Sequence, residues 1–207
     1  MALRQAPPGL DPTSLQMDQA MALNWATYPC ELVTPLYGGG IRAGEPDEQI
    51  PVRTSAIRGQ LRFWWRLLAI HKYKLPTEVA RRQEFALWGG LAETPQASRA
   101  WLRVENVSKP EAEAWAAFGK NNRGEWKALP DPKDWARDAA YALFSGQGKR
   151  PGSADSMDPA TLIKPGLTWT LNLCFNWLTS DANGAERNEA EARVLEALRW
   201  WASFGGL

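Results

Sequence analysis

The most regular apolar pattern in the chain runs from residue 55 to about residue 72 and predicts an amphipathic helix. Apolar side chains recur there every three or four residues, as they do along one face of an α-helix. They are Ile57, Leu61, Trp64, Trp65 and Leu68. Arg58, Arg62 and Arg66 follow one another at intervals of four, so they form a basic stripe beside that face. We expect the two tryptophans to pack in the core; stacking of a ligand on their rings is the alternative.

The remaining pattern predicts three strands and several further helices. Large apolar side chains alternate most clearly over residues 167–177, which is typical of a strand. The second long helix has an apolar stripe through Val194 and Leu198, and Glu189 can pair with Arg193 on its surface. Strands are expected over 28–34, 101–107 and 167–177, and helices over 77–86 (capped by Thr77), 111–118, 131–140 and 186–204.

The order of the main elements defines the fold class. A strand, a long helix, two strands and a second long helix give β-α-β-β-α, the first five elements of the ferredoxin-like (RRM-like) β-α-β-β-α-β fold. We therefore predict an α+β protein with this core and helical insertions. Residues 1–24 are rich in proline and polar side chains and should form a flexible arm. Residues 25–207 should form one domain, with an insertion at about 108–160.

The start of the helix at residue 55 has the features of an anion site. Ser55 is a good N-cap, and the free N–H groups and positive end of a helix suit a phosphate. Gly59 costs about 1 kcal/mol relative to alanine inside a helix, which indicates a close approach to the backbone there. The alternative is an ordinary core helix whose arginines are solvated or paired with carboxylates.

Composition and charge narrow the classes of protein. The chain is 44% hydrophobic and 23% charged, as in an ordinary soluble protein, although twelve tryptophans indicate a core or an interface rich in large rings. The net charge is only +1, yet residues 50–82 hold eight Lys and Arg against the single acid Glu78. Cys30 and Cys174 lie in apolar stretches and should be reduced core thiols. The sequence has no apolar run long enough to cross a membrane, and its N-terminus lacks a signal-peptide pattern. We therefore expect a cytoplasmic protein with no membrane partner.

Several kinds of catalytic site are excluded by the residues present. His71 is the only histidine, which excludes a Ser-His-Asp triad or a histidine-rich metal site within one chain. The glycines at 38–40 lack the lysine of a nucleotide-binding loop. We therefore expect no cofactor and no metal. The triple glycine is either a flexible turn or a place where a bound polyanion can approach the backbone closely.

A set of motifs spread over most of residues 28–207 resembles one known family. The motifs are Thr34-Pro35 followed by Gly38-Gly39-Gly40, the helix at 57–66, Trp88-Gly89-Gly90, Lys164-Pro165-Gly166, and the aromatic and glycine-rich end at 200–207. Together they resemble the RAMP superfamily of CRISPR-associated RNA-binding proteins. Within it, the chain is most similar to the first subunit of the type III-B (Cmr) effector complex. Such proteins carry a glycine- and arginine-rich loop and a closing strand after the second helix, which we expect to follow Leu207.

The resemblance implies an RNA-binding subunit used in antiviral defense. It would hold guide RNA, target RNA or both near the 3′ end of the guide, together with other RAMP subunits. The expected RNA contacts are Gly38, Gly39, Gly40, Arg53, Ser55, Arg58, Gly59, Arg62 and Arg66.

Two alternatives to a binding subunit stay open. In related RAMP backbone subunits, an aspartate in the loop before the first helix serves RNA cleavage, and Asp47 occupies that loop here. The first alternative is therefore a metal-dependent RNA endonuclease using Asp47. We expect no catalysis, because the subunit that the chain most resembles is a binding subunit. The second alternative is a protein–protein interaction module whose tryptophans bind another protein.

Overall fold

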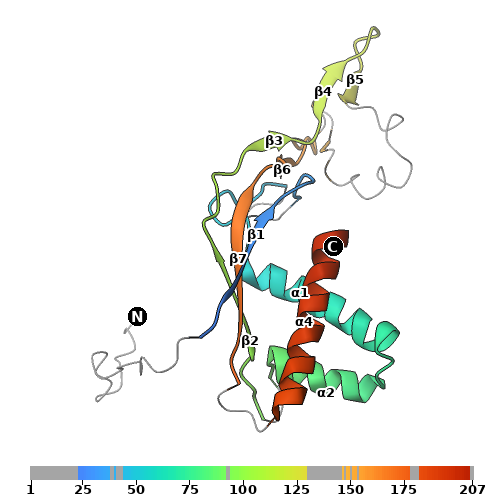
Figure 1. Ribbon diagram of the computed structural model, residues 1–207. Helices are drawn as coiled ribbons and strands as arrows, with labels where there is room; N and C mark the ends of the chain where they lie inside the picture. Colours follow the sequence, from blue (N-terminus) through green and yellow to red (C-terminus); the bar gives the residue numbers. More distant parts are fainter. Residues whose placement is uncertain are drawn as a thin grey trace, which may run out of the picture.

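The chain folds into helices and antiparallel sheets, an α+β architecture (Figure 1). The computed structural model describes residues 23–37, 40, 44–91, 94–129, 146, 148–149, 151–152, 154–177 and 182–205. The arm expected over residues 1–24 therefore lies almost wholly outside the described residues, as does the helix expected over 131–140. The α+β class predicted from the pattern is confirmed.

The main sheet has three strands in the order β1-β7-β2. They are β1 (Ala26–Glu31), β2 (Ala100–Glu105) and β7 (Thr168–Phe175). The central strand β7 is antiparallel to both neighbours. All three strands were predicted, although β1 begins and ends a few residues earlier than the pattern indicated.

The long helices lie on one side of this sheet (Figure 1). They are α1 (Thr54–Leu67), which continues into the π-helix η2 (Leu68–Lys72), then α2 (Thr77–Trp88) and α4 (Gly184–Phe204). The helices predicted over 55–72, 77–86 and 186–204 are confirmed. Thr77 is not the N-cap of α2, however: Pro76 holds that position, and no side chain caps the helix. At α4 the cap is a reciprocal pair, in which Asn183 and Glu186 each accept from the other's backbone N–H.

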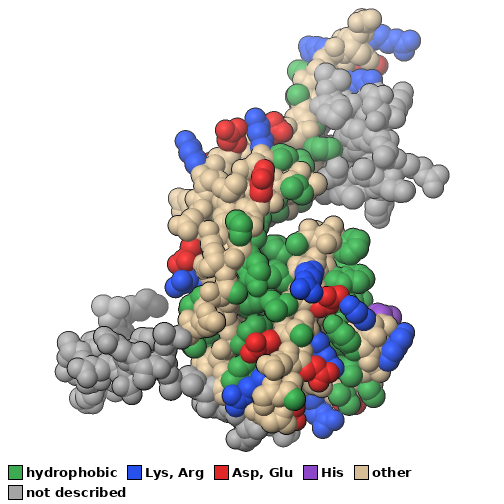
Figure 2. All heavy atoms as spheres, viewed as in Figure 1, with side chains coloured by type: hydrophobic (Ala, Val, Ile, Leu, Met, Phe, Trp, Pro, Cys, Tyr) green, Lys and Arg blue, Asp and Glu red, His purple; other side chains and the backbone are tan. Residues whose placement is uncertain are grey.

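The core lies between the sheet and the helices. Leu61 of α1, Leu171 of β7 and Val194 of α4 are fully buried and belong to one apolar cluster. The tryptophans Trp65, Trp88 and Trp169 also lie in this cluster, as the tryptophan-rich composition predicted. Figure 2 shows apolar side chains gathered where the helices meet the sheet. Burial of large apolar side chains, each contributing about 1.5–3 kcal/mol, holds the two layers together.

The segment between β2 and β7 forms strands where the sequence indicated a helix. β3 (Ala112–Ala114) pairs with β6 (Thr161–Ile163), and β4 (Ala117–Lys120) pairs with β5 (Trp126–Leu129). The helix predicted over 111–118 is therefore wrong, and so is the helical character of this described part of the insertion. Helix propensity is a weak preference, and pairing with β6 far along the chain overrides it. The β4–β5 hairpin extends beyond the end of the main sheet (Figure 1).

The three strands of the main sheet and the helices that cover it agree with the β-α-β-β-α order predicted from the sequence. β1 and β2 run in the same direction with β7 between them, and α1 and α4 lie on one face of the sheet. Among the described residues, no strand pairs with the outer edge of β1. The complete ferredoxin-like fold therefore stays a prediction.

Candidate nucleic-acid interface

Helix α1 begins one residue earlier than the sequence indicated. Its N-cap is Arg53, whose carbonyl accepts from the N–H groups of Ala56 (3.0 Å) and Ile57 (3.2 Å). Ser55 is thus an exposed residue of the first helical turn, and its predicted role as N-cap is wrong. No side chain caps α1, and its first turn holds no acidic residue. No acidic side chain of the first turn therefore offsets the partial positive charge at the N-terminus of α1.

Asp47 organises the loop that leads into α1. Its carboxylate accepts from the N–H groups of Ile50 (2.9 Å) and Gln49 (3.1 Å) and pairs with the Arg53 guanidinium at 2.7 Å. The Ile50 N–H first, and then the Arg53 side chain, hold the pKa of Asp47 below its ordinary value. Asp47 and Arg53, predicted as a catalytic alternative and an RNA contact, are therefore engaged with each other in the same loop.

Arg58 and Gly59 form the open part of α1. The Arg58 side chain is half-buried and makes no hydrogen bond or ion pair with the part of the chain that the structure describes. Gly59 is exposed, and a Cβ added there would meet no atom within 4 Å. The close approach that a mid-helix glycine indicated is therefore not made by the described residues themselves.

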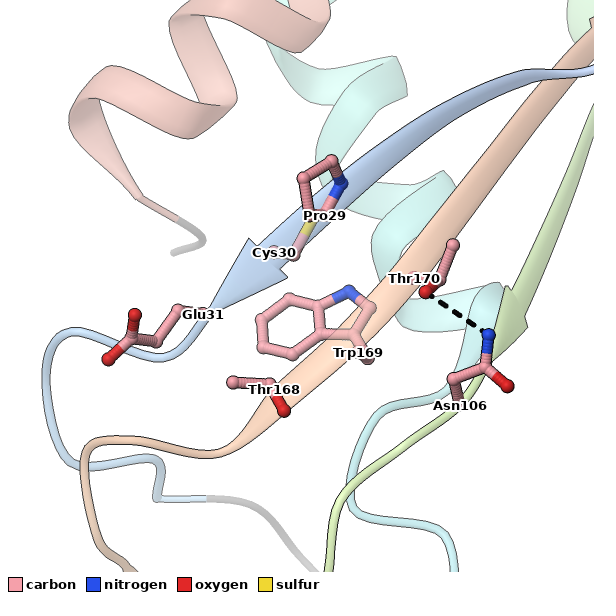
Figure 3. Close-up of a pocket in the computed structure, with 7 residues that line it drawn as sticks. All are labelled: Pro29, Cys30, Glu31, Asn106, Thr168, Trp169 and Thr170. Carbon is pink, nitrogen blue, oxygen red and sulfur yellow. Dashed lines mark hydrogen bonds between the residues drawn. The ribbon is translucent and has the colours of Figure 1, made fainter.

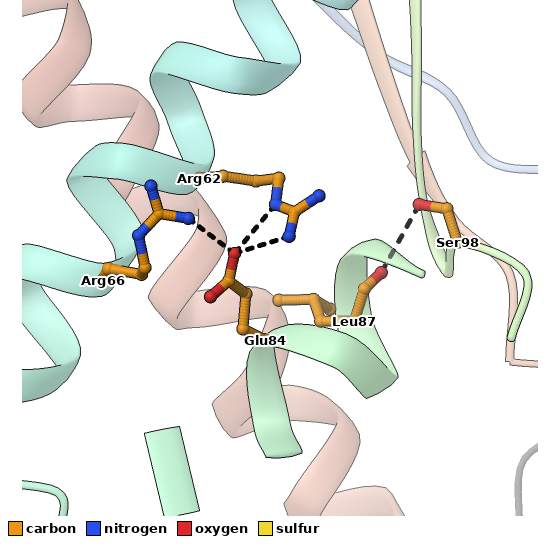
Figure 4. Close-up of polar contacts among 5 residues, drawn as sticks. All are labelled: Arg62, Arg66, Glu84, Leu87 and Ser98. Carbon is orange, nitrogen blue, oxygen red and sulfur yellow. Dashed lines mark hydrogen bonds and ion pairs between the residues drawn. The ribbon is translucent and has the colours of Figure 1, made fainter. Parts of the chain in front are cut away.

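Arg62 and Arg66 are tied to the neighbouring helix by one carboxylate (Figure 4). Oε1 of Glu84 on α2 accepts from Arg62 Nε at 2.8 Å and lies 2.7 Å from Arg62 Nη2 and from Arg66 Nη1. Both arginine side chains are still partly exposed, at 36% and 46%. The ion pairs anticipated as the alternative for these arginines are therefore present, and the guanidinium groups nevertheless reach solvent.

Glu84 is the residue of this surface that the sequence reasoning missed. It is 8% exposed and lies among the buried positions of α2 with Ala80, Leu87 and Trp88. An acid in the apolar stripe of a helix is a readable signal, because a buried carboxylate needs a partner. The basic stripe of the preceding helix supplies that partner.

Of the triple glycine at 38–40, the structure describes only Gly40. Gly38 and Gly39 lie outside the described residues. Gly40 donates its N–H to the Glu45 carbonyl at 2.7 Å, and a Cβ added to Gly40 would lie 2.9 Å from that oxygen. The missing side chain at Gly40 is thus required by the chain's own loop.

The two tryptophans of α1 have different surroundings. Trp65 is 2% exposed and belongs to the core, which confirms the packing role expected for it. Trp64 is half-buried between α1 and α4, where its ring lies 5.8 Å from those of Trp200 and Phe204. Its indole N–H donates to the Gly205 carbonyl at 3.3 Å. Both rings are therefore used by the fold.

A cavity of about 400 Å³ lies away from these residues, along the strands (Figure 3). It is lined by Pro29, Cys30, Glu31, Asn106, Thr168, Trp169 and Thr170. Across it, the Asn106 amide donates to the Thr170 hydroxyl at 3.4 Å. Burial raises the pKa of the Cys30 thiol, and that of Cys174, above the ordinary value, so both stay protonated at neutral pH. Both cysteines are free, as predicted.

Within the described ranges, no group of three His, Cys, Asp or Glu side chains is placed to hold a metal ion. None of the helices described is long and apolar enough to cross a membrane. On the face shown in Figure 2, basic side chains are interspersed with acidic ones.

A model of the RAMP superfamily matches residues 29–207, and the chain therefore belongs to that superfamily. A search of curated proteins found no match to this sequence. Membership in this superfamily indicates a CRISPR-associated role in RNA binding. Proteins of the superfamily typically work in effector complexes with RNA and other subunits.

Proposed function

We propose that this chain is a non-catalytic RNA-binding subunit of a type III-B CRISPR ribonucleoprotein in the cytoplasm. It would hold guide RNA, target RNA or both near the 3′ end of the guide, beside other RAMP subunits. The observation that carries the proposal is the open surface of α1, where Arg58 has no partner among the described residues and the backbone at Gly59 is uncovered.

This surface has the chemistry that a sugar–phosphate backbone requires. An arginine guanidinium donates several parallel hydrogen bonds to phosphate oxygens, and the absence of a side chain at Gly59 permits close contact. Contacts of this kind position RNA without reading its sequence. Sequence specificity would come from pairing between guide and target.

The proposed lack of catalysis rests on the loop before α1. The Asp47 carboxylate accepts two backbone N–H groups and pairs with Arg53, so it stabilises its own loop. Across the described parts of the chain, Asp47 belongs to no group of three His, Cys, Asp or Glu side chains that is placed to hold a metal ion for hydrolysis. Cleavage of bound RNA by Asp47 is the alternative to this proposal.

The proposal is tested by replacing Arg58 with alanine. Binding of single-stranded polyuridylate should weaken, and the slope of log affinity against log salt should fall by about 0.7, the share of one phosphate contact to a single strand. Arg123→Ala is the matched control, because it removes the same charge from the β4–β5 turn, far from α1.

Two results would contradict the proposal. An unchanged salt slope in Arg58→Ala, with the fold intact by circular dichroism, would show that the open surface at Arg58 and Gly59 does not contact the RNA. RNA cleavage in Mg²⁺ that disappears in Asp47→Ala would instead establish the endonuclease.

A further inference from the structure

The carboxylate of Glu84 is buried and pairs with two arginines of α1. Its residue is 8% exposed, and all three of its short contacts to α1 involve the same oxygen, Oε1. A buried carboxylate is costly unless it is paired, so Glu84 must hold its arginines for the helices to pack. The side chains of Arg62 and Arg66 are thereby fixed at the crossing of α1 and α2 (Figure 4).

The charges of Arg62, Arg66 and Glu84 do not cancel. Two guanidinium groups share one carboxylate, which leaves one net positive charge at a partly exposed surface. Each guanidinium also carries more N–H donors than its bonds to Glu84 use. Both the charge and the spare donors are available to an anion from solvent.

The spacing of the two guanidinium groups suits a single phosphate. Arg62 Nη2 and Arg66 Nη1 each lie 2.7 Å from the same oxygen, so these nitrogens can be no farther apart than twice that distance. An anion with several oxygens, such as a phosphate diester, can accept from both groups at once. Because the side chains are already held, binding orders them less than it would order free arginines.

We propose that Glu84 is a positioning residue that presents Arg62 and Arg66 as a seat for one phosphate of a single-stranded RNA backbone. The inference rests on the RNA binding proposed above and adds the residue that prepares the site. It extends the RNA path from the open surface at Arg58 along α1 to its crossing with α2.

A simple count of charges makes the opposite prediction. Removing an acid beside an RNA site should tighten binding, because it makes the local potential more positive. If Glu84 positions the arginines, removing its charge should weaken binding instead. The sign of the effect in Glu84→Gln therefore separates the two explanations.

The experiment measures polyuridylate binding to the full chain over a range of salt concentrations. For Glu84→Gln we expect weaker binding and a log–log salt slope lower by about 0.7, since one phosphate contact is lost. The control is Glu78→Gln, which removes the same charge from the exposed first turn of α2. It should bind as the wild type or slightly more tightly, with an unchanged slope. Binding of Glu84→Gln as tight as that of Glu78→Gln would overturn the inference.

A second variant covers the case in which Glu84→Gln does not fold. Arg62→Lys keeps the charge at a partly exposed position but loses the planar fork that reaches both Glu84 and a phosphate. We expect weaker binding by this variant at every salt concentration, and wild-type binding would also overturn the inference. Arg58→Ala separates the two proposals: if it lowers the slope while neither seat variant weakens binding, only the seat is wrong. If none of these variants weakens binding, RNA binding by α1 is itself wrong.

Discussion

Gly59 is a residue whose presence the stability of the chain does not explain. It lies inside α1 with helical neighbours on both sides, and no atom of the described chain fills the space beside it. Glycine in a helix costs about 1 kcal/mol relative to alanine because the unfolded chain loses more freedom. A glycine kept at such a position points to a requirement outside the folded chain.

Gly59→Ala should therefore separate stability from binding. We expect the free energy of unfolding to rise by about 0.5–1 kcal/mol, because alanine is the better helix former and its Cβ meets nothing. RNA affinity should fall, because the Cβ occupies the space that the RNA backbone needs. Urea denaturation and polyuridylate binding measure the two effects. The control is Gly184→Ala in α4, which also has open space but should leave RNA binding unchanged. Gly59→Ala with unchanged RNA affinity would show that no RNA contacts this turn.

At the scale of elements, the end of the first long helix is joined to α4 by a charged pair. Lys72, the last residue of η2, pairs with Glu196 of α4, which also accepts from the Trp200 indole N–H at 3.1 Å. The hydrogen bond with Lys72 first, and then that with Trp200, lower the pKa of Glu196. The bond to Glu196 raises the pKa of Lys72. The pair thus couples the π-helix to the helix that packs on α1.

This pair should make stability depend on pH in a definite direction. A carboxylate whose pKa falls on folding stabilises the protein above its unfolded pKa, about 4.3, and loses that contribution as pH falls through the folded pKa. The raised pKa of Lys72 gives stabilisation that is complete below its unfolded pKa, about 10.4, and is lost as pH rises through the folded value. The pair therefore stabilises the fold throughout the neutral range.

Lys72→Met tests this dependence. The difference in Tm between the wild type and the variant should be greatest near neutral pH. It should shrink as the pH falls below the unfolded glutamate pKa, about 4.3, and through the lowered pKa of Glu196 in the folded protein. Thermal unfolding between pH 3 and 7 measures it. Lys109→Met removes an exposed lysine that has no partner among the described residues, and it serves as control. A Tm difference that is constant across this range would mean that the pair contributes nothing to folding.

At the scale of the whole molecule, β1 is an edge strand: no other strand of the described residues pairs with the backbone groups on its outer side. Leu32 donates its N–H to Leu167 of the neighbouring segment, and the antiparallel ladder alternates from there. Pro29, opposite Thr170, is therefore at a position whose backbone nitrogen faces away from β7. Proline has no N–H to offer, so it interrupts the row of donors at which another strand could pair.

Pro29→Val should increase self-association. Valine favours strands and restores an outward N–H, so a second chain can pair along the whole of β1. We expect the wild-type chain to associate weakly through this edge and the variant to associate at lower concentration. Sedimentation velocity over a concentration series measures the difference. Pro95→Val, at an exposed position outside the sheet, is the control. A variant that sediments like the wild type at every concentration would show that this edge is not used.

The sequence by itself determined the type and approximate extent of the long elements. The apolar stripe through Leu61 and Trp65 predicted α1, and the alternation through Leu171 and Leu173 predicted β7. Burial on one face imposes a period of 3.6 or 2 residues on the chain, and that period can be read locally. The family motifs, including the arginine–tryptophan helix, were likewise readable without a structure.

Only the tertiary structure decided which carboxylate the arginines of α1 pair with and how the insertion between β2 and β7 folds. Glu84 lies 22 residues from Arg62, and nothing local indicates that these two residues meet. Ala112 likewise pairs with Ile163 in a strand, although its local sequence favours a helix. The choice of partners depends on which segments packing brings together, because ion pairs and strand pairing add too little alone to dictate a fold. The long elements followed from local burial patterns, whereas the pairing of Glu84 with Arg62 and Arg66 followed only from how α1 and α2 pack.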